Sequence, residues 1–161
     1  MWRDFLRAHG TIVRRLESEL LAEQDLPLAF YDVLVQLAEV PDRRLRMTDL
    51  AGRVLLSRSG LSRLINRLER DGLVERAPCP GDARGTYAVL TDAGMTRLRA
   101  AAPTHLRGIA RHMTGHFAAD EIEQFGVLLR TLLDGVARSG GEVHGTPQPG
   151  TRATPGAEQS A

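Results

Sequence analysis

Apolar residues recur every three or four positions along most of the chain, which is the spacing of one buried helix face. The pattern predicts a first helix over residues 2–24 and a second over about 28–40. Pro27 separates the two, and Pro41-Asp42 ends the second, because the residue before a proline disfavours the helical conformation. Each helix has an apolar side and a polar side, so each is expected to pack against other elements.

The middle of the chain predicts two short helices in close succession. Thr48 fits the N-cap of a helix over residues 49–55. Ser57 fits the N-cap of the next helix, which runs to Asp71 with Gly72 as its left-handed C-terminal cap.

Three segments have the character of strands rather than helices. Residues 45–47 fit a very short strand, and residues 73–77 and 86–90 fit two longer ones. Residues 78–85, between the longer strands, are rich in turn-forming proline and glycine. The sequence therefore predicts a β-hairpin with a long tip.

Two long helices complete the pattern. Thr91-Asp92 caps a helix that reaches about residue 117, and Pro103 inside it is expected to kink or split it. A last helix over 120–138 carries a wide apolar stripe. Residues 139–161 contain five Gly, three Pro and a single Val, so they cannot bury enough apolar surface to fold and are expected to form a disordered tail.

The order of elements defines the expected fold class. A helix-turn-helix followed by a hairpin is a winged helix, so the sequence predicts a mainly α fold with a winged helix-turn-helix lobe. There is no apolar run of 18 residues, which argues against a transmembrane helix. The single cysteine, Cys79, excludes an internal disulfide framework and multi-cysteine zinc motifs. A soluble, cytoplasmic protein is expected.

Charge is distributed unevenly along the chain. The net charge of +1 is the sum of −4 over residues 1–42, +5 over 43–84, +1 over 85–138 and −1 over 139–161. The near-neutral total thus conceals a basic middle, which is the electrostatic footprint expected for contact with phosphate. All 21 basic residues are arginine, so every cationic contact would come from a guanidinium, which can fork and stack.

The predicted helix that starts at Ser57 carries the candidate site. Its apolar stripe leaves a polar face whose arginines can fork to guanine and whose asparagine can pair with adenine in a major groove. Serines at the helix start can bind a phosphate, and Gly60 allows close approach to the DNA backbone. The candidate DNA-binding residues on this helix are Ser57, Arg58, Ser59, Gly60, Ser62, Arg63, Asn66 and Arg67.

The hairpin tip supplies a second candidate contact. Arg84 lies between small neighbours at the end of a projecting loop, where it could enter the narrow minor groove of DNA. Asp82 could hold that guanidinium in place. An Asp–Arg pair that only stiffens the turn is the simpler alternative, and the two roles are compatible.

This region resembles the MarR family of transcriptional regulators. The resemblance rests on Leu55 to Arg76, LLSRSGLSRLINRLERDGLVER, which is similar to that family's recognition-helix signature. Residues 82–85 and 89–94 are similar to its wing and the start of its next helix, although Ala83 stands where the family commonly has arginine. The similarity covers about residues 5–138 and is strongest over 45–95.

The resemblance implies a homodimer that binds double-stranded DNA. It implies a helical dimerisation region, residues 1–27 and 96–138, around a DNA-binding domain, residues 28–95. The wide apolar stripe independently favours a dimer, because one chain would leave it exposed. The resemblance also implies a repressor that a small-molecule effector, often an aromatic acid, releases from DNA; the candidate lining residues are His9, Phe30 and Tyr31, for which ordinary core packing is the simpler alternative.

For Cys79 and for three histidines near one helical face, we favour a structural explanation over a functional one. Cys79 could sense oxidants, but thiol sensors of the resembled family place the cysteine in the first helix. His105, His112 and His116 fall near one helical face, yet no cysteine lies nearby and the HExxH pattern is absent, so a partly buried position is expected rather than a metal site.

Other function classes fit the sequence less well. A winged-helix module for protein–protein contact without DNA binding is the alternative, but such modules usually lack an arginine-rich face. No catalytic constellation is recognisable, so we expect no enzyme and no cofactor.

Overall fold

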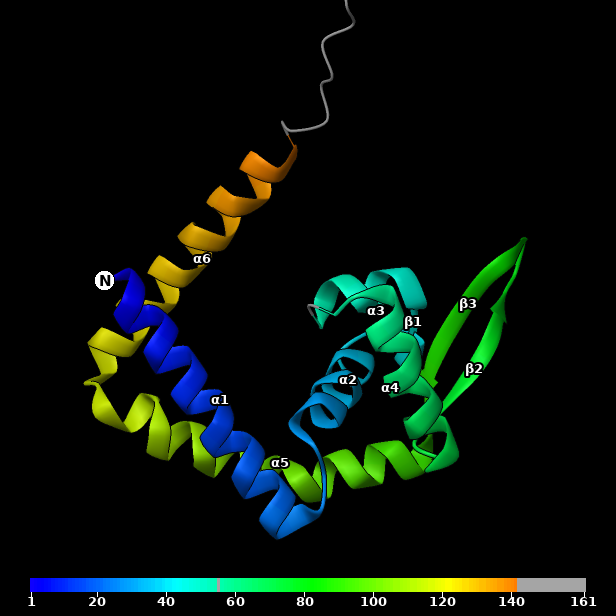
Figure 1. Ribbon diagram of the computed structural model, residues 1–161, viewed down its shortest axis with the longest axis horizontal. Coiled ribbons are helices and arrows are strands. Elements are labelled where there is room, and N and C mark those ends of the chain that lie inside the picture. Colours follow the sequence, from blue (N-terminus) through cyan, green and yellow to red (C-terminus); the bar gives the residue numbers. More distant parts are fainter. Residues whose placement is uncertain (55, 142–161) are drawn as a thin grey trace, which may run out of the picture. The chain divides into compact units, whose positions relative to one another are not determined.

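Residues 1–54 and 56–141 are described by the structure, a computed structural model of the chain (Figure 1). They form two compact units that divide between Phe117 and Ala118, and each unit is described by itself. From residue 142 onward, the predicted tail lies outside the described residues. The functional division into a dimerisation region, a DNA-binding domain and a tail stays a prediction.

The elements follow the predicted order and confirm a mainly α, winged helix-turn-helix fold. In the first unit they are α1 (Trp2–Gln24), α2 (Leu28–Ala38), β1 (Arg44–Arg46), α3 (Met47–Arg53), α4 (Arg58–Arg70), β2 (Val74–Cys79), β3 (Asp82–Leu90) and α5 (Asp92–His112), with short 3-10 turns at Pro41–Arg43 and Thr114–His116. The second unit contributes α6 (Ala119–Gly141), which extends past the predicted end at residue 138.

The core of the first unit lies around α2. Leu34 and Leu37 of this helix are fully buried against Leu50 of α3 and Ile65 of α4, and Leu20 of α1 joins the same cluster. Burying each such side chain contributes about 1.5–3 kcal/mol. The helices of the winged lobe are therefore held by one continuous apolar core.

The three strands form one antiparallel sheet in the order β1-β3-β2, and the β2–β3 hairpin projects from the helices (Figure 1). The prediction of a long tip over 78–85 is wrong. The strands continue to Cys79 and from Asp82, so the turn is only Pro80-Gly81, with Gly81 at a φ of 79°. A register shift at the end of β2 lets β3 carry the extra residues.

The caps of α4 agree with the prediction. The Oγ atom of Ser57 accepts a hydrogen bond from the Gly60 N–H at 3.1 Å, and Gly72 follows the helix with a φ of 70°. The predicted N-cap Thr48 is wrong, because β1 leads directly into α3 and Arg46 occupies the capping position. The Thr48 hydroxyl instead donates to Asp49 within the helix.

α5 begins at a hydroxyl, that of Thr91, which joins its first turn to the backbone that follows α4. The Oγ1 atom of Thr91 accepts from the Gly94 N–H at 2.9 Å and donates to the Gly72 carbonyl oxygen at 2.7 Å, directly after α4. The helix bends but continues through Pro103, so of the two expected outcomes it shows the kink and not the split (Figure 1). It ends at His112 rather than near residue 117, because Met113 leaves the helical conformation.

α6 carries the wide apolar stripe that the sequence predicts. Its first turn is capped by Glu121, whose carboxylate accepts from the Ala118 N–H at 2.8 Å. Leu128, Leu133 and Val136 are 66%, 67% and 63% exposed. None of the helices in the described part of the chain is both long and apolar enough to cross a membrane.

We predict that Gly94→Ala destabilises the winged lobe. A Cβ at this position would lie 2.1 Å from the Leu73 carbonyl oxygen and 2.6 Å from Leu90 Cδ1, so the backbone would have to move. The free energy of unfolding in urea should fall by about 1–3 kcal/mol. Gly52→Ala in α3, where nothing lies within 4 Å, is the control and should raise stability by about 0.5–1 kcal/mol. Equal effects of the two substitutions would contradict the close packing at Gly94.

Candidate nucleic-acid interface

The two sides of α4 differ sharply. Leu61, Ile65 and Leu68 are at most 1% exposed and fix the helix in the core. The opposite side therefore faces solvent over its whole length. Its exposed members include Ser59, Ser62, Arg63, Asn66 and Arg70, and Arg58 is also exposed.

The start of α4 has the polar geometry expected for anion binding. Ser57 Oγ caps the Gly60 N–H and lies 3.3 Å from Ser59 Oγ, so both hydroxyls sit at the first turn. The first turn of any helix also presents backbone N–H groups and the positive end of its dipole. A Cβ at Gly60 would meet only Ser57 Oγ, at 3.1 Å, and Leu56 Cβ, at 4.0 Å, so this glycine allows close approach from outside.

A contact from the wing holds Asn66. The Nη2 atom of Arg76, on β2, donates to Asn66 Oδ1 at 2.7 Å. The other terminal nitrogen of the same guanidinium pairs with Glu69, one turn further along α4. Arg76 thus joins α4 to the wing, a role that the sequence pattern did not reveal.

Arg67 is partly diverted from the outer face. Its guanidinium lies over the ring of Phe30, with Cζ 5.0 Å from the centroid. Such a cation–π contact contributes about 0.5–1 kcal/mol at an exposed site. Phe30 is itself buried in the core, which agrees with ordinary core packing, the simpler alternative for this residue.

A groove of about 360 Å³ lies beside α4 and the wing. Its lining includes Arg46, Thr48, Ser62, Arg76 and Asp82. Three strands and two helices contribute to it, so it exists only in the folded lobe.

Asp82 has partners that the sequence did not reveal. Its Oδ2 accepts from Arg46 of β1 at 3.1 Å, and its Oδ1 accepts from the Gly85 N–H at 3.1 Å. The backbone of Arg84 belongs to β3, but its side chain lies outside what the structure describes. Its proposed minor-groove role therefore stays a prediction.

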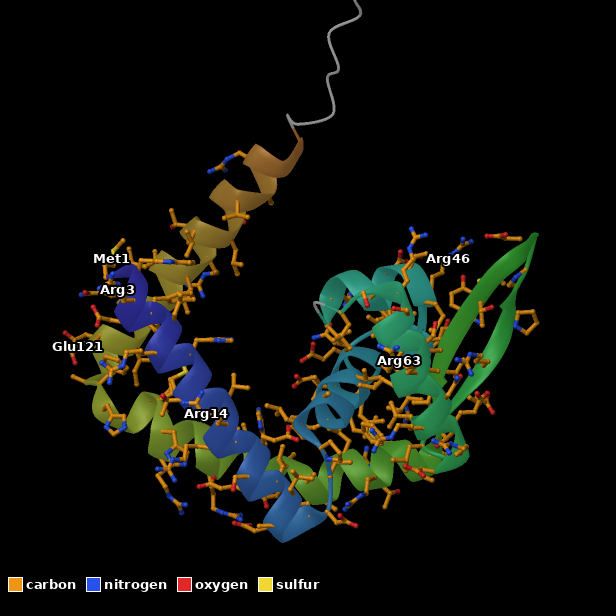
Figure 2. All side chains as sticks on the ribbon, viewed as in Figure 1. Met1, Arg3, Arg14, Arg46, Arg63 and Glu121 are labelled. Carbon is orange, nitrogen blue, oxygen red and sulfur yellow. The ribbon has the colours of Figure 1, made fainter. Side chains whose placement is uncertain are left out.

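β1 adds basic side chains that sequence reasoning missed. Arg44 and Arg46 share one face of the strand, and both guanidinium groups lie over the ring of Tyr87, at 5.3 and 5.9 Å from its centroid. The alternation of Arg44-Leu45-Arg46 was the available signal, because strand residues two apart point the same way. Figure 2 shows Arg46 and Arg63 on neighbouring elements of this lobe.

A separate cleft of about 410 Å³ opens among α2, α3 and α5. Tyr31 lines it and packs against His105, with ring centroids 4.4 Å apart. His105 Nδ1 is buried without a hydrogen-bond partner, and burial lowers the pKa of His105 below its ordinary 6.5. Burial raises the pKa of Asp32 on the same wall, with a further contribution from the negative charge of Glu17. His9 lies on α1 against Phe5 and does not line this cleft.

His112, His116 and Cys79 do not assemble into a metal site within the described part of the chain. His112 Nε2 lies 2.8 Å from the carboxylate of Glu19, and His116 belongs to the 3-10 turn beyond α5, so the predicted common face is interrupted. Over residues 1–54 and 56–141, no three His, Cys, Asp or Glu side chains lie close enough to hold a metal ion. Cys79 is 4% exposed in the hairpin.

Fold and site together define a winged helix-turn-helix protein in which α4 presents an exposed, arginine-rich face. A model of the MarR family matches residues 24–85. Sco3205, a MarR family transcriptional regulator from Streptomyces coelicolor whose crystal structure was determined in complex with DNA, is 36% identical and superposes with a TM-score of 0.78. That match covers 83% of this chain and 84% of the other.

Curated relatives give the same result over a shorter segment. The HTH-type transcriptional regulator YkoM of Bacillus subtilis is 36% identical over 85 residues, which are 53% of this chain and 54% of YkoM. The homoprotocatechuate degradative operon repressor of Escherichia coli is 34% identical over 97 residues, which are 60% of this chain and 64% of the repressor. The chain thus matches less than two thirds of the length of these relatives. The match to Sco3205, by contrast, spans more than two thirds of both chains at 36% identity. This chain therefore belongs to the MarR family of transcriptional regulators.

We predict that His105 makes the fold sensitive to mild acid. The pKa of His105 is lower in the folded state than in the unfolded state. As the pH falls below about 6.5, the unfolded chain therefore binds a proton at His105 more readily than the folded chain does, and unfolding is favoured. The free energy of unfolding in urea should therefore decrease between about pH 7 and about pH 5.5, and it should decrease less in His105→Phe, which keeps the stack on Tyr31. An identical decrease in both proteins would refute this assignment.

Proposed function

We propose that this protein is a DNA-binding transcriptional regulator that acts as a homodimeric repressor on a pseudo-palindromic operator. The observation that carries the proposal is the exposed arginine-rich face of α4. The buried stripe on the other side of α4 fixes this helix in the core, and the projecting β2–β3 wing follows it in the chain. Arginine and asparagine on such a face are the side chains that read base edges in a major groove. We also propose a cytoplasmic location, which the similarity to an HTH-type regulator of Bacillus subtilis and a repressor of Escherichia coli supports.

The proposed DNA-binding residues have four roles. Arg58, Arg63 and Asn66 would reach base edges, and Arg67 would reach the flanking backbone. Ser57, Ser59, Gly60 and Ser62 would contact phosphate at the helix start and along the groove. Asp82 would order the hairpin and Arg84 would enter the minor groove, with Arg44 and Arg46 adding contacts to the DNA backbone.

Exposed apolar residues support a dimer. Trp2 and Leu6 near the start of α1 and Leu132 and Leu133 of α6 are each about half exposed or more. Covering these side chains with a second copy would remove apolar surface that a monomer would leave in water. Two-fold symmetry would then place two α4 helices about 34 Å apart, one DNA turn, on an inverted repeat.

We infer that the cleft beside His105 receives a small-molecule effector. The cleft combines apolar Val35, Leu106 and Ile109 with polar groups that could fix the orientation of a ligand, namely Asp32, Gln36, Glu39 and Arg53, and the buried Nδ1 of His105 has no hydrogen-bond partner. The relative from Escherichia coli is named as a repressor of a degradative operon, which supports repression as the sign of control. A ligand of this cleft should weaken duplex binding by the wild-type protein.

The alternative, a winged-helix module for protein contact without DNA binding, has less support. The second unit offers a large apolar surface, but α4 presents mostly guanidinium, hydroxyl and amide groups. Interfaces between proteins favour an apolar centre over a uniformly basic one. A transcriptional regulator is not an enzyme, and we propose no reaction.

We predict that Arg63→Ala weakens DNA binding by about 1–3 kcal/mol, because one base-edge contact is lost. The measurement is fluorescence anisotropy at fixed salt with a duplex selected from a random pool by the wild-type protein. Arg84→Ala should have a similar effect. Arg107→Ala removes the same charge from α5, where it pairs with Glu23, and should change affinity less than about twofold. Equal affinities for all four proteins would reject the proposed interface.

We also predict that Leu132→Glu with Leu133→Glu converts a dimer into a monomer. Two carboxylates on the exposed stripe of α6 would have to be buried unpaired in the dimer. Sedimentation should show the wild type as a dimer that prefers an inverted repeat over a half-site. The variant should sediment at half the mass and bind both duplexes alike. A wild-type monomer with equal affinity for both duplexes would contradict the dimer.

A further inference from the structure

The contact between Arg76 and Asn66 restricts what Asn66 can read. Arg76 Nη2 lies 2.7 Å from the side-chain amide of Asn66. Because a guanidinium has only donors, the amide atom that faces it must be the oxygen, Oδ1. The amide orientation is therefore fixed by chemistry, and Nδ2 takes no part in this contact on an exposed residue.

Both terminal nitrogens of the Arg76 guanidinium have acceptors on α4. The second terminal nitrogen pairs with Glu69, and residues 66 and 69 lie one turn apart on the same side of α4. The Arg76 side chain is only 29% exposed. Two acceptors on one helix thus hold a planar donor from the wing in a single position.

This arrangement disfavours the usual pairing of asparagine with adenine. That pairing needs Oδ1 to accept from the adenine amino group while Nδ2 donates to N7. One lone pair of Oδ1 is already occupied, and the positive hydrogens of Arg76 repel a second amino group that approaches the same oxygen. Nδ2 keeps two hydrogens, which a neighbouring cation polarises further.

We propose that Arg76 is a positioning residue for base specificity, which makes Asn66 a pure donor that reads guanine. Guanine presents two adjacent acceptors, N7 and O6, in the major groove, whereas adenine presents one acceptor and one donor. The proposal rests on the DNA-binding function proposed above. It adds that a side chain of the wing, without contacting the base, selects the base read by the helix.

The test is selection of duplexes from a random pool by the full-length chain, followed by sequencing. Asn66→Ala identifies the base pair that depends on Asn66, because preference at that pair alone should disappear. In the wild type this pair should be G·C, with guanine favoured over adenine by about fivefold or more. Arg76→Met should shift the same pair toward A·T, because Oδ1 becomes free to accept.

Arg44→Met is the matched control. It removes an equal charge from β1, where the guanidinium contacts Asp42 and Tyr87 rather than Asn66. It should lower overall affinity without altering preference at the Asn66-dependent pair. If Arg76→Met does not fold, as judged by its unfolding transition, Asn66→Asp serves instead; it keeps the acceptor for Arg76, removes the Nδ2 donors and should abolish the guanine preference.

Each outcome decides between distinct conclusions. An Asn66-dependent G·C pair that shifts in Arg76→Met supports the proposal. An Asn66-dependent A·T pair in the wild type, no Asn66-dependent pair, or a preference unchanged in Arg76→Met overturns it while leaving DNA binding intact. Failure to enrich any duplex would overturn the proposed function itself.

Discussion

Burial of one side of α4 is the constraint on which the candidate site depends. Leu61, Ile65 and Leu68 lie in the core almost without exposure, so the helix cannot rotate about its axis without bringing apolar surface into water. Its polar side is therefore presented in one fixed orientation. Affinity for a rigid double helix needs such preorganisation, because side chains that must first be ordered lose binding free energy.

The sheet provides the second fixed element. β3 pairs with both β1 and β2, so it carries Asp82 and Tyr87 to positions where they meet arginines of β1. Arg76 of β2 then reaches back to α4. Strand pairing thus makes one polar surface from segments that are up to about forty residues apart in the sequence.

The features that could be predicted from the sequence depend on residues close together in the chain. The features that it missed depend on contacts between separate elements. Ser57 and Gly72 were predictable because a cap acts within four residues of the helix end. The pairing of Arg76 with Asn66 depends on the direction in which β2 leaves α4, which no local pattern encodes. Thr48 failed as a cap for a related reason, since a strand that joins the sheet places Arg46 at the capping position. The length of β3 depended on a register shift, which the turn residues alone do not specify.

The hydroxyl of Thr91 links the start of α5 to the backbone that follows α4. It bonds the first turn of α5 to the carbonyl that follows α4, so the two helices share a pivot at one end. A helix of 21 residues is about 30 Å long, and α5 carries His105 in its far half. A rotation of about 5° at the pivot would displace the far end by roughly 2.6 Å. A displacement of about an ångström beside His105 would therefore correspond to a rotation of α5 by only a few degrees about its contact with the residue that follows α4.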